Sequence, residues 1–270
     1  MKENSKQSRW LIALSLLLNV FLIASIIFIG YIKTDFIKRQ FVKLGISKIE
    51  STKRTDYWCI RGWTNTLDKL NLNVDVVFFG NSITAGSSFH DFFTDKSICN
   101  LGYPGDNLTG MMARVQQIQI VKPEKVFVMG GINGLKQMPL NIFETQYREL
   151  IVAIKDTVPT AEIYLQSILP VSNAHSRAAS NKKISDCNLI IRDIAKSLGC
   201  KYIDLYSLYT KNDEINPDYS RDGVHIKEEH YDKWIEAIRP FIYDSLSLLS
   251  GITFGLGKKY RPNILLFDLF

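Results

Sequence analysis

Residues 74–80 read Val-Asp-Val-Val-Phe-Phe-Gly, and Asn81-Ser82-Ile83-Thr84 follows directly. A short apolar run that ends at a glycine is typical of a buried strand. Strands that are apolar on both faces belong to parallel sheets, which helices cover on both sides. A serine in the turn after such a strand can present its hydroxyl above the sheet edge. This stretch therefore indicates an α/β fold and a place for a site.

The rest of the chain alternates between similar apolar runs and segments with helical periodicity. Four more strands are predicted, over residues 98–101, 125–129, 162–169 and 201–205. Helices are predicted over residues 107–121, 142–158, 178–198 and 227–249. Gly199 is the expected C-cap of the third helix, because glycine readily adopts the left-handed conformation. We therefore predict a three-layer α/β/α sandwich with a central five-stranded parallel sheet, and a site at the carboxyl ends of its strands.

An uncharged apolar segment precedes this domain. Residues 11–32 contain no charged side chain, and a helix rising about 1.5 Å per residue over that length spans a hydrocarbon core of about 30 Å. A cleaved signal peptide has a shorter apolar region that ends in small residues, so we favour an uncleaved transmembrane signal-anchor helix. The predicted divisions are a short tail (1–10), this anchor (11–32), a basic juxtamembrane connector (33–70), the α/β domain (71–250) and a C-terminal tail of unknown role (251–270).

The charges on the two sides of the anchor are nearly balanced and do not decide its orientation. N-terminal anchors commonly translocate the domain that follows. We therefore expect a single-pass membrane protein whose catalytic domain is extracytoplasmic.

The net charge of +6 is confined to the N-terminal region. Ten of the 33 lysines and arginines, but only three of the 27 acidic residues, fall within residues 1–55. The remaining chain has 23 basic and 24 acidic residues. This balance leaves no excess positive charge to neutralise phosphates, so the sequence argues against a nucleic-acid partner.

The four cysteines, Cys59, Cys99, Cys187 and Cys200, have none of the spacings of a metal site. We interpret them as small apolar residues. A disulfide between Cys187 and Cys200 stays open if the domain lies in an oxidising compartment, because sequence alone does not fix the pairing.

Three residues have the chemistry of a nucleophilic site. Ser82 follows the first strand, and Asp222-Gly223-Val224-His225 lies in a predicted loop before the last helix. A spacing of three residues lets one turn bring the Asp222 carboxylate to Nδ1 of His225, which leaves Nε2 to take a proton from a serine. A metal site that adds His230 is disfavoured, since five residues separate the two histidines and place them about 140° apart around a helix.

Two glycine-containing loops follow the second and third strands and offer further donors. They contain Gly105 and Asn133. Glycine lets a backbone N–H approach a ligand closely, and an asparagine amide is a neutral donor suited to a tetrahedral oxyanion. Each loop alone is also an ordinary turn.

The candidate residues occur in the order Ser, Gly, Asn, Asp, His, each after the appropriate strand. In this order the chain resembles the GDSL/SGNH hydrolase family, over roughly residues 72–245. Residues 166–171 (Gln-Ser-Ile-Leu-Pro-Val) and 222–234 are similar to segments of its acetylhydrolase-like members. The resemblance implies a triad of Ser82, Asp222 and His225, and an oxyanion hole formed by the N–H groups of Ser82 and Gly105 and the amide of Asn133.

Two positions depart from the family pattern. The first block usually reads Gly-Asp-Ser, whereas Asn81 stands here, and Gly134 follows Asn133 where an aspartate is common. Neither change removes a group from the triad or the oxyanion hole, so they bear on rate and substrate preference. Thr84 stands where a Gly-x-Ser-x-Gly elbow has its last glycine, which disfavours an α/β-hydrolase.

The resemblance implies a serine esterase that works through an acyl-enzyme and requires no metal or organic cofactor. The expected substrate is a small-molecule or glycan ester, and removal of small acyl groups such as acetyl from carbohydrate is favoured. Two alternatives stay open. One is a lysophospholipase or thioesterase for longer acyl chains, and the other is a non-catalytic carbohydrate-binding or envelope scaffold protein that retains the fold. The sequence does not indicate an oligomeric state.

Overall fold

The structure, a computed structural model, describes residues 67–69, 72–175 and 178–243, which belong to one compact unit. Several predicted parts of the chain lie outside these ranges. They are the short tail (1–10), the anchor (11–32), nearly all of the connector (33–70), the C-terminal tail (251–270) and Cys59. Among the helices of the described ranges, none is both long and apolar enough to cross a membrane.

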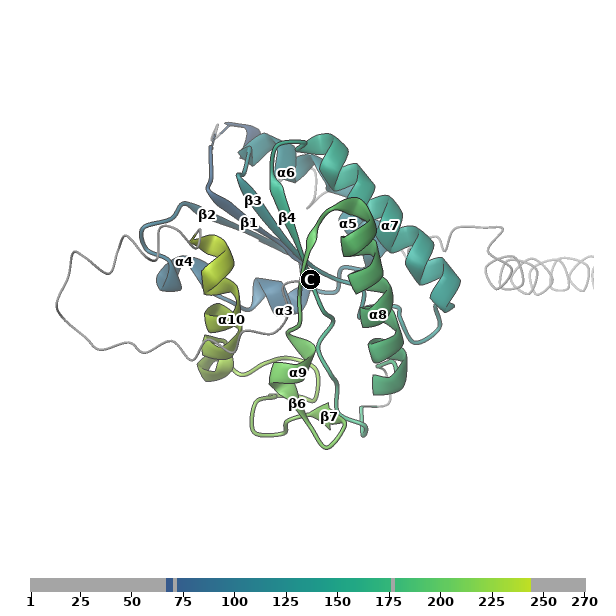
Figure 1. The fold of residues 1–270 in the computed structure, drawn as a ribbon. Helices are drawn as coiled ribbons and strands as arrows, with labels where there is room; N and C mark the ends of the chain where they lie inside the picture. Colours follow the sequence, from purple (N-terminus) through teal and green to yellow (C-terminus); the bar gives the residue numbers. More distant parts are fainter. Residues whose placement is uncertain (1–66, 70–71, 176–177, 244–270) are drawn as a thin grey trace, which may run out of the picture. The chain divides into compact units, whose positions relative to one another are not determined.

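Five parallel strands form the central sheet, as the apolar runs predict (Figure 1). They are β1 (Val76–Gly80), β2 (Ile98–Gly102), β3 (Lys125–Met129), β4 (Glu162–Gln166) and β5 (Lys201–Ile203). Their spatial order is β2-β1-β3-β4-β5, the order of flavodoxin-like doubly wound sheets. The order reverses between β1 and β3, and ligands bind such sheets at the carboxyl ends of the strands next to this reversal.

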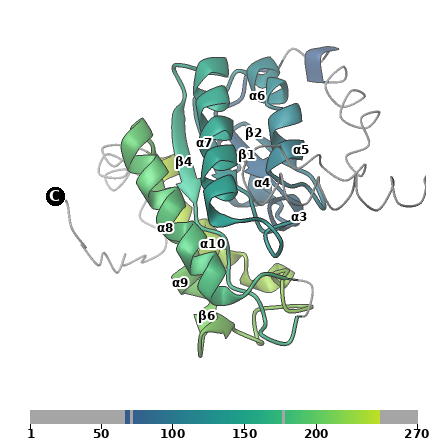
Figure 2. The same cartoon turned by 90° about the vertical axis from the view of Figure 1, so that its right-hand side faces the viewer.

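Helices cover both faces of the sheet, as predicted for a three-layer sandwich (Figure 1, Figure 2). One face carries α5 (Leu108–Ala113), α6 (Gln116–Val121), α7 (Leu140–Thr157) and α8 (Asn181–Leu198), and the other carries α4 (Phe89–Phe92) and α10 (Asp232–Ile242). Two further short helices, α3 (Ser82–Ala85) and α9 (Tyr206–Tyr209), follow β1 and β5. A small antiparallel hairpin of β6 (Thr210–Lys211) and β7 (Glu214–Ile215) follows α9.

A stack of aromatic rings joins the sheet to α4 and α10. Phe78 and Phe127 lie side by side on β1 and β3, with ring centroids 5.1 Å apart. Phe89 of α4 stacks on Phe78 at 3.6 Å, and Trp234 of α10 meets Phe89 edge-on at 5.4 Å. All four side chains are fully buried. Because aromatic pairs stabilise beyond the area that they bury, this stack fixes α10 against the strand that precedes Ser82.

The prediction of a single helix over residues 107–121 is wrong. The structure has two short helices, and Arg114 and Val115 separate α5 from α6. Arg114 has a non-helical backbone (φ −122°, ψ 17°), and its side chain is buried. The apolar periodicity continues through the break, so it could not reveal that one charged side chain turns inward there.

Other element ends also differ from the predictions. The predicted strands 162–169 and 201–205 end earlier, at Gln166 and Ile203. Helix α8 begins at Asn181 because the Ser180 side chain caps its first turn, and it ends at Gly199 (φ +67°), the predicted C-cap. The predicted helix at 227–249 is a 3-10 turn, Glu228–His230, followed by α10, and its part beyond residue 243 lies outside the described residues. The β6–β7 hairpin was not predicted.

The three described cysteines are free thiols, so the structure contains no disulfide between Cys187 and Cys200. Cys187 is buried in α8, and burial raises the pKa of its thiol to about 12. This thiol behaves as a small apolar side chain, as expected.

Candidate active site

The carboxyl ends of β1, β2 and β3 are level with one another. Gly80 pairs with Gly102 of β2 on one side and with Met129 of β3 on the other. A Cβ atom at Gly80 would lie 2.1 Å from Oγ1 of Thr84 and 2.5 Å from the backbone oxygen of Met129. No side chain fits at this position, so glycine lets α3 turn back closely over the strand that it follows.

Ser82 opens α3 immediately after β1. The side chain of the preceding Asn81 is buried, and its Oδ1 accepts a hydrogen bond from the N–H of Ile83 at 3.0 Å. This is the N-cap interaction that a carboxylate or an amide oxygen can make equally well. The departure from Gly-Asp-Ser therefore retains the cap, and it avoids burying a charge beside the serine.

The structure brings Ser82, His225 and Asp222 together. Oγ of Ser82 lies 2.9 Å from Nε2 of His225, and Nδ1 of the same ring lies 2.6 Å from Oδ2 of Asp222. The other carboxylate oxygen, Oδ1 of Asp222, accepts hydrogen bonds from the backbone N–H groups of Val224 (3.0 Å) and His225 (2.8 Å). One turn of chain thus fixes the carboxylate against the imidazole, as the three-residue spacing predicts.

The charge on Asp222 follows from these contacts. Its partial burial favours the neutral acid, but hydrogen bonds from the backbone and ring of His225 and from Val224 outweigh that effect and lower the pKa of Asp222 to about 2. An ionised carboxylate only accepts hydrogen bonds, so Nδ1 of His225 carries the proton. In a neutral imidazole Nε2 is then the acceptor, and the Ser82 hydroxyl donates to it.

Two of the three predicted oxyanion donors, Gly105 and Asn133, lie in adjoining loops. Gly105 has φ +79° with open space around its Cα, so glycine is needed here for its backbone conformation. Nδ2 of Asn133 donates a hydrogen bond to the backbone oxygen of Asp106 at 2.8 Å, which joins the loop after β3 to the loop after β2. One N–H of the Asn133 amide is thereby used for orientation. The amide nitrogen carries a second N–H.

Sequence reasoning missed several residues that support this site. The hydroxyl of the buried Tyr231 donates to the backbone oxygen of Ile83 at 2.8 Å, which ties the segment after His225 to α3. The N–H of Ser172, in the loop after β4, donates to the backbone oxygen of Gly223 at 2.7 Å. These contacts join segments far apart in the chain, so no local pattern signals them.

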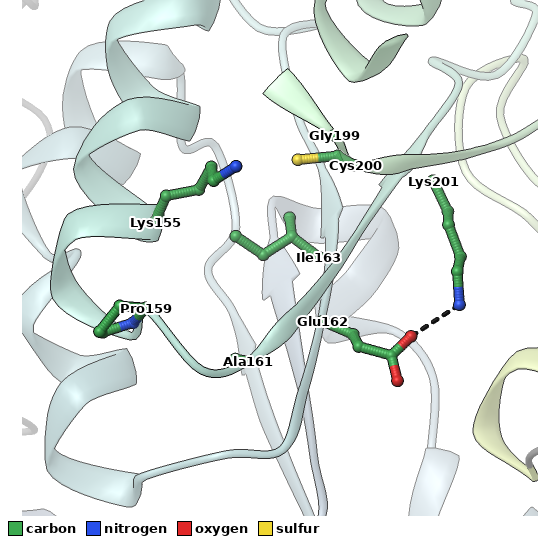
Figure 3. Close-up of a pocket in the computed structure, with 8 residues that line it drawn as sticks. All are labelled: Lys155, Pro159, Ala161, Glu162, Ile163, Gly199, Cys200 and Lys201. Carbon is green, nitrogen blue, oxygen red and sulfur yellow. Dashed lines mark hydrogen bonds and ion pairs between the residues drawn. The ribbon is translucent and has the colours of Figure 1, made fainter. Parts of the chain in front are cut away.

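A hollow lies at the opposite edge of the sheet from Ser82, by the amino ends of β4 and β5 (Figure 3). Lys155 and Cys200 line it, and an exposed ion pair of Lys201 with Glu162 (2.6 Å) stands beside them. Its walls contain neither serine nor histidine. It has no part in the arrangement around Ser82.

No cluster of three potential metal ligands occurs within the described ranges. His230, which a metal site with Asp222 and His225 would require, lies against the ring of Tyr219, with ring centroids 4.6 Å apart.

Fold and site together define a doubly wound α/β protein with a hydrogen-bonded Ser-His-Asp constellation at the carboxyl edge of its sheet. The model of the GDSL-like lipase/acylhydrolase family matches residues 78–233, which is more than half of the chain. The chain belongs to this family, and the matched region contains every predicted site residue. No curated protein matches the sequence significantly.

Solved structures share the fold at low sequence identity. A Bacteroides fragilis protein assigned as an acylhydrolase has 21% identity and a TM-score of 0.62, and the match covers 73% of this chain and 100% of that one. A GDSL-like lipase from Bacteroides thetaiotaomicron has 22% identity and a TM-score of 0.59, over 68% and 96% of the two chains. A mutant acetyl-xylooligosaccharide esterase from Geobacillus Stearmophilus has 17% identity and a TM-score of 0.50, over 64% and 96%.

Proposed function

We propose that the protein is a serine esterase that hydrolyses carboxylic esters through an acyl-enzyme. The observation that carries the proposal is the continuous hydrogen-bond chain from Ser82 through His225 to Asp222, with distances of 2.9 and 2.6 Å. Membership of an acylhydrolase family supports the same class of reaction.

In the proposed reaction, Nε2 of His225 takes the proton from Oγ of Ser82 as Oγ attacks the ester carbonyl carbon. The tetrahedral intermediate collapses, the bond to the alcohol oxygen breaks, and the imidazolium donates its proton to that oxygen. A water molecule then gives a proton to Nε2 while its oxygen attacks the acyl carbon. The acid leaves, and Oγ of Ser82 regains the proton. Asp222 stabilises the imidazolium throughout.

Negative charge develops on the carbonyl oxygen in both halves of this reaction. The N–H groups of Ser82 and Gly105 and the second N–H of the Asn133 amide are the proposed donors to it. A donor of this kind contributes about 10²–10³-fold to the rate. No metal or organic cofactor enters any step.

Small acyl groups on carbohydrate are the proposed substrates. The four large apolar side chains that are exposed in the described ranges are Phe92, Val152, Leu189 and Leu208. None lies in the loops 102–107, 130–135 or 220–226 that carry the oxyanion donors and His225. Within the described part of the chain, these loops therefore present no strongly exposed large apolar side chain, which favours a short acyl group. The esterase of similar fold that acts on acetyl-xylooligosaccharide supports the same choice.

The 22 uncharged residues at 11–32 support a further proposal, that this segment anchors the protein with its domain on the extracytoplasmic side. Protease treatment of intact cells that express a C-terminally tagged full-length chain tests the topology. We expect the tag to be digested without lysis, whereas protection of the tag would contradict an extracytoplasmic domain.

The substrate is tested with p-nitrophenyl esters from acetyl to palmitoyl, together with acetylated oligosaccharides and lysophospholipids, on the full-length protein. We expect the highest kcat/KM for acetyl esters and release of acetate from the sugars. A preference for palmitoyl esters or lysophospholipids would replace this proposal with the long-chain alternative. A fluorophosphonate probe that fails to label Ser82 of the folded protein would favour a non-catalytic scaffold.

A further inference from the structure

Arg114 is a buried arginine at the break between α5 and α6, outside the proposed triad and oxyanion hole. Its side chain is 2% exposed, and its Nε donates a hydrogen bond to Oδ2 of Asp106 at 2.6 Å. Nη1 donates to the backbone oxygen of Leu101 and Nη2 to that of Gly80, both at 2.7 Å. The guanidinium also lies over the Phe79 ring, 4.2 Å from its centroid. One side chain therefore joins the ends of β1 and β2 to the loop after β2.

The acidic partner connects this arginine to both loop donors. Asp106 directly follows Gly105, and its backbone oxygen is the acceptor for Nδ2 of Asn133 at 2.8 Å. The carboxylate is completely inaccessible to solvent. At the other end of the guanidinium, the carbonyl of Gly80 belongs to the strand end two residues before Ser82.

We propose that the Arg114–Asp106 pair positions the oxyanion hole, because it sets where the Gly105 N–H and the Asn133 amide stand relative to Ser82. This inference rests on the proposed esterase function. Oxyanion donors act at about 2.7–3.1 Å from the developing charge. A shift of the Asp106 loop by a fraction of an ångström therefore reduces the stabilisation of the transition state by these donors. Binding of the ester in the ground state changes little.

The chemistry of the pair favours a role in geometry over one in stability. Replacing a buried ion pair with apolar residues is often neutral or stabilising, so stability alone does not require these charges. A guanidinium presents its donors in a rigid planar fork, whereas a lysine ammonium is a point charge on a flexible stem. In Arg114 this fork binds three acceptors that belong to three segments of the chain. The interruption of the helix at Arg114 lets this fork reach them.

The test compares Arg114→Lys, which keeps the charge and loses the fork, with Asp106→Asn, which keeps the shape and loses the charge. Kinetics with p-nitrophenyl acetate are measured on each full-length variant, alone and combined with Asn133→Ala. We expect Arg114→Lys to lower kcat about tenfold with KM within about threefold, since part of the oxyanion contribution is lost. In the Asn133→Ala background the same change should lower kcat only about threefold, because one of the two donors that the pair positions, the Asn133 amide, is already gone.

Lys125→Met is the matched control. This buried lysine donates to the backbone oxygens of Phe241 and Ile242 at the opposite edge of the sheet. The Lys125→Met variant should have a lower melting temperature and an unchanged kcat. Asp106→Asn should behave as Arg114→Lys does, and if it does not fold, Arg114→Lys decides alone.

The inference is overturned if Arg114→Lys retains wild-type kcat, or if its loss is undiminished when Asn133 is alanine. It is also overturned if Lys125→Met loses as much kcat at an equal loss of melting temperature. These results leave the esterase proposal intact, because the wild-type protein is then active. An inactive wild-type protein would defeat the proposed function, and the inference with it.

Discussion

Oγ of Ser82 lies 2.9 Å from Nε2 of His225 although 143 residues separate them in the chain. Each half of this contact has its own support. Ser82 is the first residue of the short helix α3, which follows β1. The backbone oxygen of His225 accepts hydrogen bonds from the N–H of Arg221 (2.9 Å) and from Oγ of Ser220 (3.1 Å). The distance between the two halves depends on how α10 and the turn before it pack against α3.

Tyr231 connects these two halves directly, and Tyr231→Phe tests its importance. The change removes the hydrogen bond to the backbone oxygen of Ile83 without altering the ring. We expect a loss of about 0.5–1.5 kcal/mol in the free energy of unfolding, together with a lower kcat, because α3 is then less firmly placed against His225. Chemical denaturation and steady-state kinetics measure the two effects.

Tyr209→Phe is the control for that experiment. The Tyr209 hydroxyl also donates to a backbone oxygen, that of His230, at 2.8 Å. This variant should lose comparable stability and keep its kcat. Equal losses of kcat in both variants would show that the effect comes from lower stability rather than from the placement of Ser82.

Asn133→Ala tests the proposed side-chain donor to the oxyanion. We expect kcat to fall about 10²-fold with little change in KM, since the donor acts mainly in the transition state. Asn141→Ala, the same substitution at an exposed position of α7, should leave both constants unchanged. A rise in KM with unchanged kcat would instead assign Asn133 to substrate binding.

The pKa of Asp222 predicts a dependence of stability on pH. Its folded-state pKa of about 2 lies below the ordinary value of 3.8. Ionised Asp222 therefore stabilises the fold fully above about pH 4, and this contribution is lost as the pH falls towards 2. The free energy of unfolding of Asp222→Asn should decline less than that of the wild-type protein between about pH 5 and pH 2.5. Identical declines would contradict the contacts that lower this pKa.

Much of the fold was predictable because the deciding signals are local. The continuous apolar runs of β1 and β3 reflect strands that are buried on both faces. The helical periodicity of α7 and α8 reflects helices that are buried on one face. The break at Arg114 could not be predicted, since it depends on acceptors in β1, β2 and the loop after β2. The β6–β7 hairpin was missed because strands of two residues have no periodicity.

The candidate site shows the same division. Asp222 and His225 could be paired from their spacing, because one turn brings them together. Ser82, Gly105 and Asn133 were located through the order of blocks that resembles a known family. Tyr231, Ser172, Arg114 and Asp106 were missed, because each acts through a buried contact with a distant segment. Asn81 departs from the family pattern, yet the structure shows the same N-cap that an aspartate would form.

Hydrolysis of p-nitrophenyl acetate by Ser82→Ala tests the proposed nucleophile most directly. The matched control is Ser88→Ala, since Ser88 is exposed and its side chain makes no capping hydrogen bond to α4. We expect Ser82→Ala to fold with an unchanged melting temperature and to lose several orders of magnitude in kcat, on the order of 10⁶-fold for a removed nucleophilic serine. Ser88→Ala should retain full activity. A Ser82→Ala protein that kept more than about a tenth of the wild-type rate would contradict the assignment of Ser82 as nucleophile.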